Sequence, residues 1–62
     1  MEYRIKGDNW ELSAPTPGTV MAQAAIIAQT DGTCPVEVRF DNGGGYTSIV
    51  NADGEVIERR PL

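Results

Sequence analysis

One stretch of the chain, residues 17–30, has the apolar spacing of a helix, and no other stretch has it. Five apolar residues are spaced there so that they share one helix face: Val20, Met21, Ala24, Ile27 and Ala28. Thr16 can cap the first turn, with Pro17 in the first helical position, where a missing N–H costs nothing. Gly32 is placed to end the helix in a left-handed conformation. The sequence therefore predicts a fold with a single helix.

Before this helix, the sequence predicts a β-hairpin. In residues 2–6, Tyr3 and Ile5 alternate with charged side chains, which is the pattern of a half-buried strand. Gly7-Asp8-Asn9 follows as a turn sequence, because Gly and Asn tolerate positive φ. Residues 10–14 alternate again and predict a second strand, which is the least marked of the chain.

After the helix, a two-residue period returns and predicts three more strands, at residues 36–40, 46–50 and 55–59. Turn sequences rich in Asp, Asn and Gly separate them. The resulting order, ββαβββ, is met most simply by a four- or five-stranded antiparallel sheet with one α-helix packed on one face. We therefore expect a single α+β domain over residues 1–62.

The same pattern predicts the hydrophobic core, which consists of the inward-facing positions of the strands and the helix. These are Tyr3, Ile5, Trp10, Leu12, Val20, Met21, Ala24, Ile27, Val36, Val38, Phe40, Val50 and Val56. Full burial of one large side chain contributes about 1.5–3 kcal/mol, so this core is sufficient but thin. An enclosed substrate cavity would remove core that so short a chain can hardly spare, which argues against a deep enzyme pocket.

The chain has no histidine and one cysteine, Cys34, which excludes classical catalytic triads and most zinc sites. Cys34 lacks a histidine to act as its base, and Pro35 follows it directly, so we expect a small buried or loop-edge residue. The glycines at 43–45 lack the Gly-Lys-Ser/Thr sequence of a phosphate-binding loop. We therefore expect no enzyme activity, no metal site and no cofactor.

Charge and hydropathy set the expected partners and location. Nine acidic and five basic residues give a net charge of −4, which disfavours direct nucleic-acid binding and suits a basic protein partner. No apolar stretch approaches the roughly 20 residues of a membrane span. Because no signal peptide is visible and no cysteine pair is present, the cytoplasm is the expected location.

The longest uncharged stretch of the sequence lies over the helix. From Leu12 to Thr30 no residue is charged, although 23% of the chain is. A helix on a small sheet is expected to show charged side chains to water, but the outer positions here are Ala22, Gln23, Ile26 and Gln29. Depletion of charge is typical of the centre of protein–protein interfaces. The other explanation is that alanine-rich helices form well without charge.

Acidic residues on the strands and turns form a second candidate binding surface. They are Glu2, Asp8, Glu11, Glu37, Asp41, Glu55 and Glu58. Several could line up across the open face of the sheet and imitate a run of phosphates. Basic residues alternate with them, which predicts cross-strand ion pairs on a solvated face instead. The sequence leaves both interpretations open.

A short acidic chain with a strand–helix–strand order and no catalytic set resembles the small phage-encoded anti-CRISPR proteins. The resemblance lies in the general character of the whole chain, from Met1 to Leu62. It implies a non-catalytic inhibitor in the host cytoplasm that binds a CRISPR effector complex and blocks target DNA binding or activation. Acidic side chains would then meet lysine and arginine residues of the partner.

Two other classes of function compete with the inhibitor. In a self-assembling structural module, the uncharged helix face would bury against its copy in a symmetric homodimer. Loss of such a dimer on Ile26→Glu would distinguish this class from the inhibitor. A small enzyme would require a cleft lined by carboxylates with perturbed pKa values.

Overall fold

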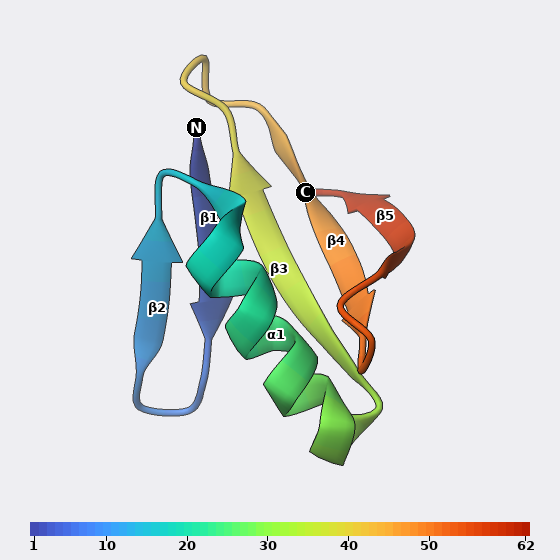
Figure 1. Cartoon of the computed structure of the whole chain (residues 1–62). Coiled ribbons are helices and arrows are strands. Elements are labelled where there is room, and N and C mark those ends of the chain that lie inside the picture. The colour runs from blue at the N-terminus through green and yellow to red at the C-terminus, as the bar shows by residue number, and fades with distance from the viewer.

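The protein consists of one α-helix packed on one face of a five-stranded antiparallel sheet (Figure 1). The computed structural model covers residues 1–62. The strands lie in the order β2-β1-β3-β4-β5, and every neighbouring pair is antiparallel. In chain order the elements are β1 (Glu2–Lys6), β2 (Glu11–Ala14), α1 (Pro17–Asp31), β3 (Thr33–Arg39), β4 (Gly45–Asn51) and β5 (Val56–Pro61). The predicted α+β architecture is confirmed, with five strands.

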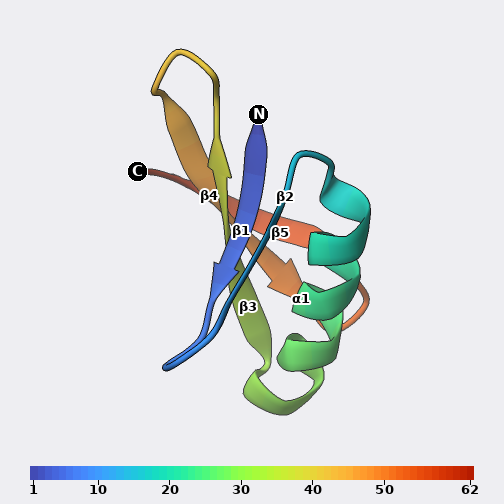
Figure 2. The ribbon, with the colours of Figure 1, turned by 90° about the vertical axis from the view of Figure 1, so that its left-hand side faces the viewer.

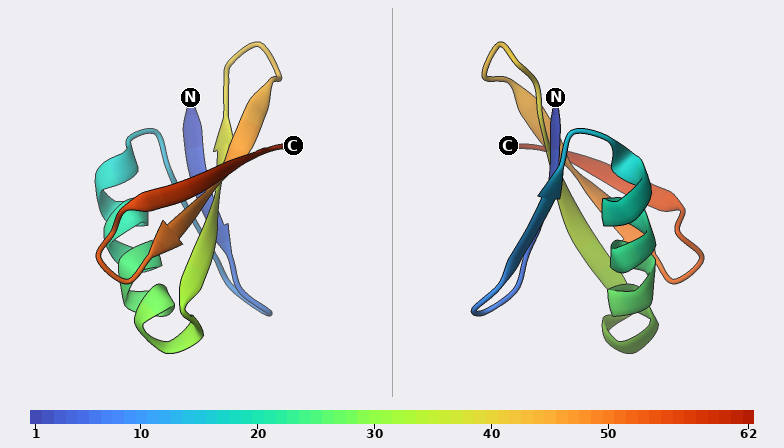
Figure 3. Two further views of the ribbon diagram at one scale, coloured as in Figure 1. Left: turned by 90° about the vertical axis from the view of Figure 1, so that its right-hand side faces the viewer. Right: turned by 60° about the vertical axis from the view of Figure 1, so that its left-hand side comes forward.

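The helix lies against one side of the sheet and leaves the other side uncovered (Figures 2 and 3). The β1–β2 turn, the C-terminus of α1 and the β4–β5 turn lie at the lower end of the sheet in Figure 1. The N-terminus, the β2–α1 connection and the β3–β4 loop lie at the upper end. The two ends therefore present different sets of loops to a partner.

The ends of α1 follow the expected signals, with one difference. Thr16 occupies the N-cap position in an extended conformation, but its side chain makes no capping hydrogen bond. Pro17 takes the first turn, as expected for a residue without an N–H. At the other end Gly32 has φ 89°, and its N–H donates to the carbonyl oxygen of Ala28 over 2.7 Å. The positive φ expected of this glycine is confirmed.

The core forms where the apolar face of α1 meets the central strands. Its buried members are Ile5, Val20, Ala24, Ala28, Cys34, Val36, Val38 and Val50. Four other predicted core residues, Tyr3, Leu12, Met21 and Ile27, are half-buried around this cluster. Ser48 and Ile49 of β4 are also buried, although the sequence pattern did not single them out. The core is therefore built mainly from small residues.

Three predicted core residues, Trp10, Phe40 and Val56, are exposed instead, by 44%, 37% and 39%. Trp10 and Phe40 lie just outside β2 and β3, because the alternating pattern continues one residue beyond each strand. Val56 lies on β5, which α1 does not cover (Figure 3). The prediction of a buried side chain was wrong at all three positions for these local reasons.

The bounds of β3 and β5 also differ from those predicted. β3 starts at Thr33 rather than after Pro35, and β5 extends to Pro61. Pro35 lies opposite Ile49 of β4 but has no partner in β1, whose pairing with β3 covers only Glu2–Arg4. A proline is tolerated in a strand where one side of the strand lacks a partner.

Candidate protein-binding site at the split end of the sheet

The sheet is split at its lower end, between β1 and β3. Arg4 opposite Glu37 is the last pair of the β1–β3 ladder, and the β1–β2 hairpin then leaves the sheet (Figure 2). Continuing the same register would bring Lys6 opposite Pro35. Pro35 has no N–H to donate to such a ladder, so the sequence itself favours the separation.

A cleft of about 310 Å³ occupies this split. It lies between the β1–β2 hairpin, the C-terminal turn of α1 and the start of β3. We call it the Trp10 cleft; its lining includes Lys6, Asp8, Trp10, Ile27, Asp31 and Cys34. A smaller hollow of about 140 Å³ lies on the uncovered side of the sheet and shares Lys6 and Pro35 with the cleft. The split in the sheet is therefore hollowed on both faces.

The indole of Trp10 packs against the backbone of Gly7 in the β1–β2 turn. A Cβ atom on Gly7 would lie only 1.9 Å from Trp10 Nε1, so a glycine is needed for the ring to lie where it does. The Gly7 N–H also donates to the carbonyl oxygen of Trp10 over 2.9 Å and closes the turn. A large aromatic side chain thus lies over a glycine at the cleft while remaining 44% exposed.

Two carboxylates and one ammonium group line the Trp10 cleft, so its charged groups are negative in sum. Asp31 is the last residue of α1, and no basic residue lies in the last helical turn. The unpaired carbonyl groups of a helix C-terminus carry a partial negative charge, which adds to the negative potential there. The combination of an aromatic wall and acidic groups suits the apolar stem and cationic head of a lysine or arginine.

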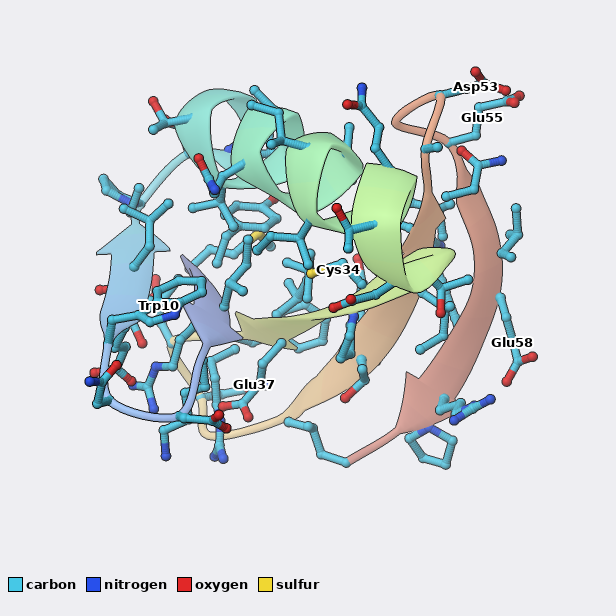
Figure 4. The ribbon with its side chains drawn as sticks, turned by 90° about the horizontal axis from the view of Figure 1, so that it is seen from below. Trp10, Cys34, Glu37, Asp53, Glu55 and Glu58 are labelled. Carbon is cyan, nitrogen blue, oxygen red and sulfur yellow. The ribbon has the colours of Figure 1, made fainter.

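Cys34 lies at the inner side of the Trp10 cleft and is 1% exposed (Figure 4). Burial raises the pKa of its thiol, and the nearby negative charge of Asp31 raises it further. Its Sγ lies 3.7 Å from the carbonyl oxygen of Pro35. The thiol therefore stays protonated near neutral pH, and the expectation that Cys34 is a small buried residue is confirmed.

Four of the predicted acidic residues lie on the uncovered face of the sheet, which we call the open sheet face. They are Glu2, Glu11, Glu37 and Glu58, and four basic residues, Arg4, Lys6, Arg39 and Arg60, lie on the same face. This face consequently carries no net charge. The net charge of −4 arises from five acidic residues in the turns, the β3–β4 loop and the end of α1, less the positive charge of Arg59 on the other side of β5.

The charges of the open sheet face are paired mostly along single strands. Arg4 Nη2 lies 2.8 Å from Glu2 Oε1, and Arg39 Nε lies 2.7 Å from Glu37 Oε1. Arg60 pairs with Glu58 in the same way. The hydrogen bond from Arg39 lowers the pKa of Glu37 below its ordinary value.

One ion pair of this face crosses between strands. Arg4 Nε lies 3.1 Å from Glu11 Oε1 of β2, without the alignment of a hydrogen bond. The ladder also places Glu2 opposite Arg39 and Lys6 opposite Glu11. Opposite charges therefore alternate across the strands as well as along them, and the run of uncompensated carboxylates that a nucleic-acid mimic needs is not formed on this face.

The other three predicted acidic residues lie in three separate connections. Asp8 is in the β1–β2 turn at the Trp10 cleft, and Glu55 is in the β4–β5 turn. Figure 4 shows Glu55 and Asp53 together at the corner away from Trp10. Asp41 lies in the β3–β4 loop and pairs with the N-terminal ammonium group of Met1, which lowers the pKa of its carboxyl. The seven predicted acidic residues are thus spread over several surfaces.

The outer face of α1 lies where the sequence predicts it. Ala22, Ile26 and Gln29 are exposed and Gln23 is half-buried. Ile26 is 57% exposed, as much as any large apolar side chain of the protein. This uncharged face remains a second candidate binding surface.

Trp10 and Asp31 were not predicted as site residues, although both line the cleft. For Trp10 a signal was present, because it follows the Gly7-Asp8-Asn9 turn directly and a turn is exposed. Asp31 is the first charged residue after the uncharged stretch and stands at a helix end where it is electrostatically unfavourable.

No group of three or more His, Cys, Asp and Glu side chains is arranged to hold a metal ion. The helix α1 does not combine the length and apolar character needed to cross a membrane. Comparison of the chain with protein-family models, with curated proteins and with solved structures gave no match.

Proposed function

We propose that the protein binds another protein without catalysing a reaction and that the Trp10 cleft is its main binding site. The observation that carries this proposal is an exposed tryptophan that packs on Gly7 and lines a cleft of about 310 Å³. Tryptophan is enriched among the residues that dominate binding energy in protein interfaces.

The partner surface that fits this site is basic. The charges of the open sheet face compensate one another, whereas Asp8 and Asp31 at the cleft outnumber its single lysine. A partner that places a lysine or arginine in the cleft would pair with these carboxylates and pack its methylene groups on Trp10. This favours a local contact with basic residues over an extended imitation of nucleic acid.

The resemblance to anti-CRISPR proteins supplies a class of partner for this site. In that proposal the protein acts in the host cytoplasm as an inhibitor of a CRISPR effector complex, whose DNA-binding surface is basic. The Trp10 cleft would occupy that surface or hold the complex in an inactive state. Inhibition would be stoichiometric, with one inhibitor consumed for each complex it blocks.

Intrinsic fluorescence provides the first test, because Trp10 is the only tryptophan of the chain. Binding of a tryptophan-free basic protein or peptide at the cleft should shift the Trp10 emission to shorter wavelength. In capture from host lysate, Trp10→Ala should lose the partner, while Phe40→Ala should retain it. Phe40 is a matched control because it is an exposed aromatic in the β3–β4 loop, and that loop lies at the opposite end of the sheet from the β1–β2 turn (Figure 1). Equal capture by both variants would contradict the proposed site.

The CRISPR effector is tested separately with a purified complex. Target DNA binding and cleavage should fall in proportion to added protein and reach completion near one equivalent. Trp10→Ala should require a much larger excess. Unchanged DNA binding and cleavage at a large excess of wild-type protein would exclude that complex as the partner and leave the cleft proposal to be judged by the capture experiment.

A second candidate function, self-assembly through the outer face of α1, is favoured by the 57% exposure of Ile26. Burial of Ile26 against a second copy would remove an apolar side chain from water. The expected result is a dimer in solution that Ile26→Glu abolishes. A dimer unaffected by Ile26→Glu would show that this face is not the contact.

A further inference from the structure

The strand β5 is an exposed edge of the sheet. It pairs with β4 on one side only, and all six of its residues are exposed. No part of α1 contacts it, and the left view of Figure 3 shows β5 in front with no helix over it. Its outer N–H and C=O groups are therefore available to a further strand. The opposite edge, β2, has only four residues against the six of β5, which makes it a poorer template.

The sequence of β5 is suited to pairing with itself. A shift in register near Ile49 and Val50 of β4 interrupts the β4–β5 ladder at the start of β5, and regular pairing follows from Glu58 to Pro61. Glu58 and Arg60 lie on the open sheet face on either side of Arg59. Two antiparallel copies of β5 centred on Arg59 would place Glu58 of each copy opposite Arg60 of the other. Opposite charges at directly facing positions stabilise a pair of strands.

Neighbouring registers lack this complementarity. If the two copies were centred on Glu58, two carboxylates would face each other; if centred on Arg60, two guanidinium groups would. Only registers that keep the open sheet faces on one side are compatible with a continuous sheet, because opposite residues point to the same face. Charge thus selects the register centred on Arg59.

Arg59 itself would face its own copy on the side of the sheet that carries α1. Its guanidinium carbon lies 5.1 Å from the centroid of the Tyr46 ring of the same chain. This cation–π contact draws the charge toward β4 and away from the two-fold axis. The repulsion at the centre is therefore reduced.

We propose that β5 pairs with β5 of a second copy of this chain, in the register centred on Arg59, to form a symmetric dimer with a continuous ten-stranded sheet. The paired segment is short, so the dimer is weak and depends on protein concentration. The two open sheet faces would form one surface. The Trp10 cleft of each copy lies near the other edge of the sheet and would stay accessible, so this proposal does not depend on the proposed partner.

Reciprocal charge variants test the proposal. Glu58→Arg places arginine opposite Arg60 in both halves of the dimer, and Arg60→Glu places two carboxylates opposite each other. Each variant should therefore sediment as a monomer of 6.7 kDa at concentrations where the wild-type chain has twice this mass. An equimolar mixture of the two variants should recover the dimer, because each arginine then faces a glutamate.

The mixture distinguishes an effect on charge pairing between chains from damage to the fold. Each variant loses the same Glu58–Arg60 ion pair within its own chain, so damage from that loss would persist in the mixture. Circular dichroism should be the same for both variants and the wild type. A wild-type chain that remains monomeric at about 1 mM would overturn the proposal. A dimer that both single variants retain, or that Ile26→Glu alone abolishes, would also overturn it.

Discussion

The indole of Trp10 lies so close to the backbone of Gly7 that a single added methyl group could not fit between them. The Cβ of an alanine at position 7 would come within 1.9 Å of Trp10 Nε1 and 2.2 Å of Trp10 Cε2. Gly7→Ala should therefore displace the ring, at only a small cost in folding free energy because Trp10 is 44% exposed and can turn away. Urea unfolding and the Trp10 emission spectrum measure the two effects.

The matched control for this prediction is Gly18→Ala. Gly18 lies in the first turn of α1, and a Cβ added there meets nothing within 4 Å. Because alanine is the better helix former, Gly18→Ala should leave Trp10 in place and raise stability by up to about 1 kcal/mol. If Gly7→Ala left the emission spectrum, the stability and partner capture unchanged, the packing of the Trp10 ring against Gly7 would be disproved.

A second prediction concerns Asp31, which combines a cost in stability with a place in the Trp10 cleft. Its carboxylate stands at the negative end of the α1 dipole, without a basic residue in the same turn. Removal of the charge by Asp31→Asn should raise the free energy of unfolding by about 0.3–1 kcal/mol. The same change should weaken capture of a basic partner, because one of two cleft carboxylates is lost.

Asp53→Asn controls for the change in net charge. Asp53 lies in the β4–β5 turn, at the corner away from Trp10 (Figure 4). The Asp53→Asn variant should have nearly the same stability as the wild type and should capture the partner nearly as well. If the two variants captured the partner equally well, the effect of Asp31 would be one of net charge and not of the cleft.

The buried thiol of Cys34 gives a third prediction. Its pKa is raised in the folded state by burial and by Asp31, so the folded chain keeps the proton that the unfolded chain loses. The associated stability is complete below the thiol pKa of the unfolded chain, about 8.5, and is lost as the pH rises toward the folded pKa. The wild-type chain should lose stability above about pH 8.5 more steeply than Cys34→Ala does.

Thiol reactivity provides an independent measurement of the same feature. A thiol-specific reagent at pH 8 should modify Cys34 slowly in the folded chain and rapidly in urea, because the thiolate is the reactive form. Rapid modification without urea would show that Cys34 is accessible and contradict its 1% exposure.

The fold was predictable because its local signals agree with one another. Pro17 and Gly32 bound the helix, its apolar face reaches the core, and residues 2–6 alternate as a strand should. Where the pattern continued past a strand end, as at Trp10 and Phe40, it predicted burial for residues that are exposed. Alternation reports the face of a strand but not its length, and the length depends on pairing with distant strands.

The candidate site was less predictable because it depends on where two distant strands separate. Arg4 opposite Glu37 ends the β1–β3 ladder, and no local pattern in residues 2–6 marks that point. Pro35 could have indicated where the ladder ends, because it has no N–H to donate, but only once β1 was known to be the neighbour of β3. The ion pairs were expected between strands, whereas Glu2–Arg4 and Glu37–Arg39 join residues two apart on one strand. Residues at that spacing lie on the same face of a strand, within reach of long side chains.

A fourth prediction follows from the Glu37–Arg39 pair. The hydrogen bond from Arg39 lowers the pKa of Glu37 in the folded state relative to about 4.3 in the unfolded chain. The stability from this pair is therefore present above about pH 4.3 and is lost as the pH falls through the folded pKa. Because the pair is partly exposed, its contribution should be below about 1 kcal/mol.

Urea unfolding at pH 7 and at pH 3 measures this contribution. Between the two pH values, Glu37→Gln should lose less free energy of unfolding than the wild type does. Glu55→Gln, which changes a carboxylate in the β4–β5 turn, should lose as much stability as the wild type. An equal loss in all three chains would mean that the Glu37–Arg39 pair does not stabilise the sheet.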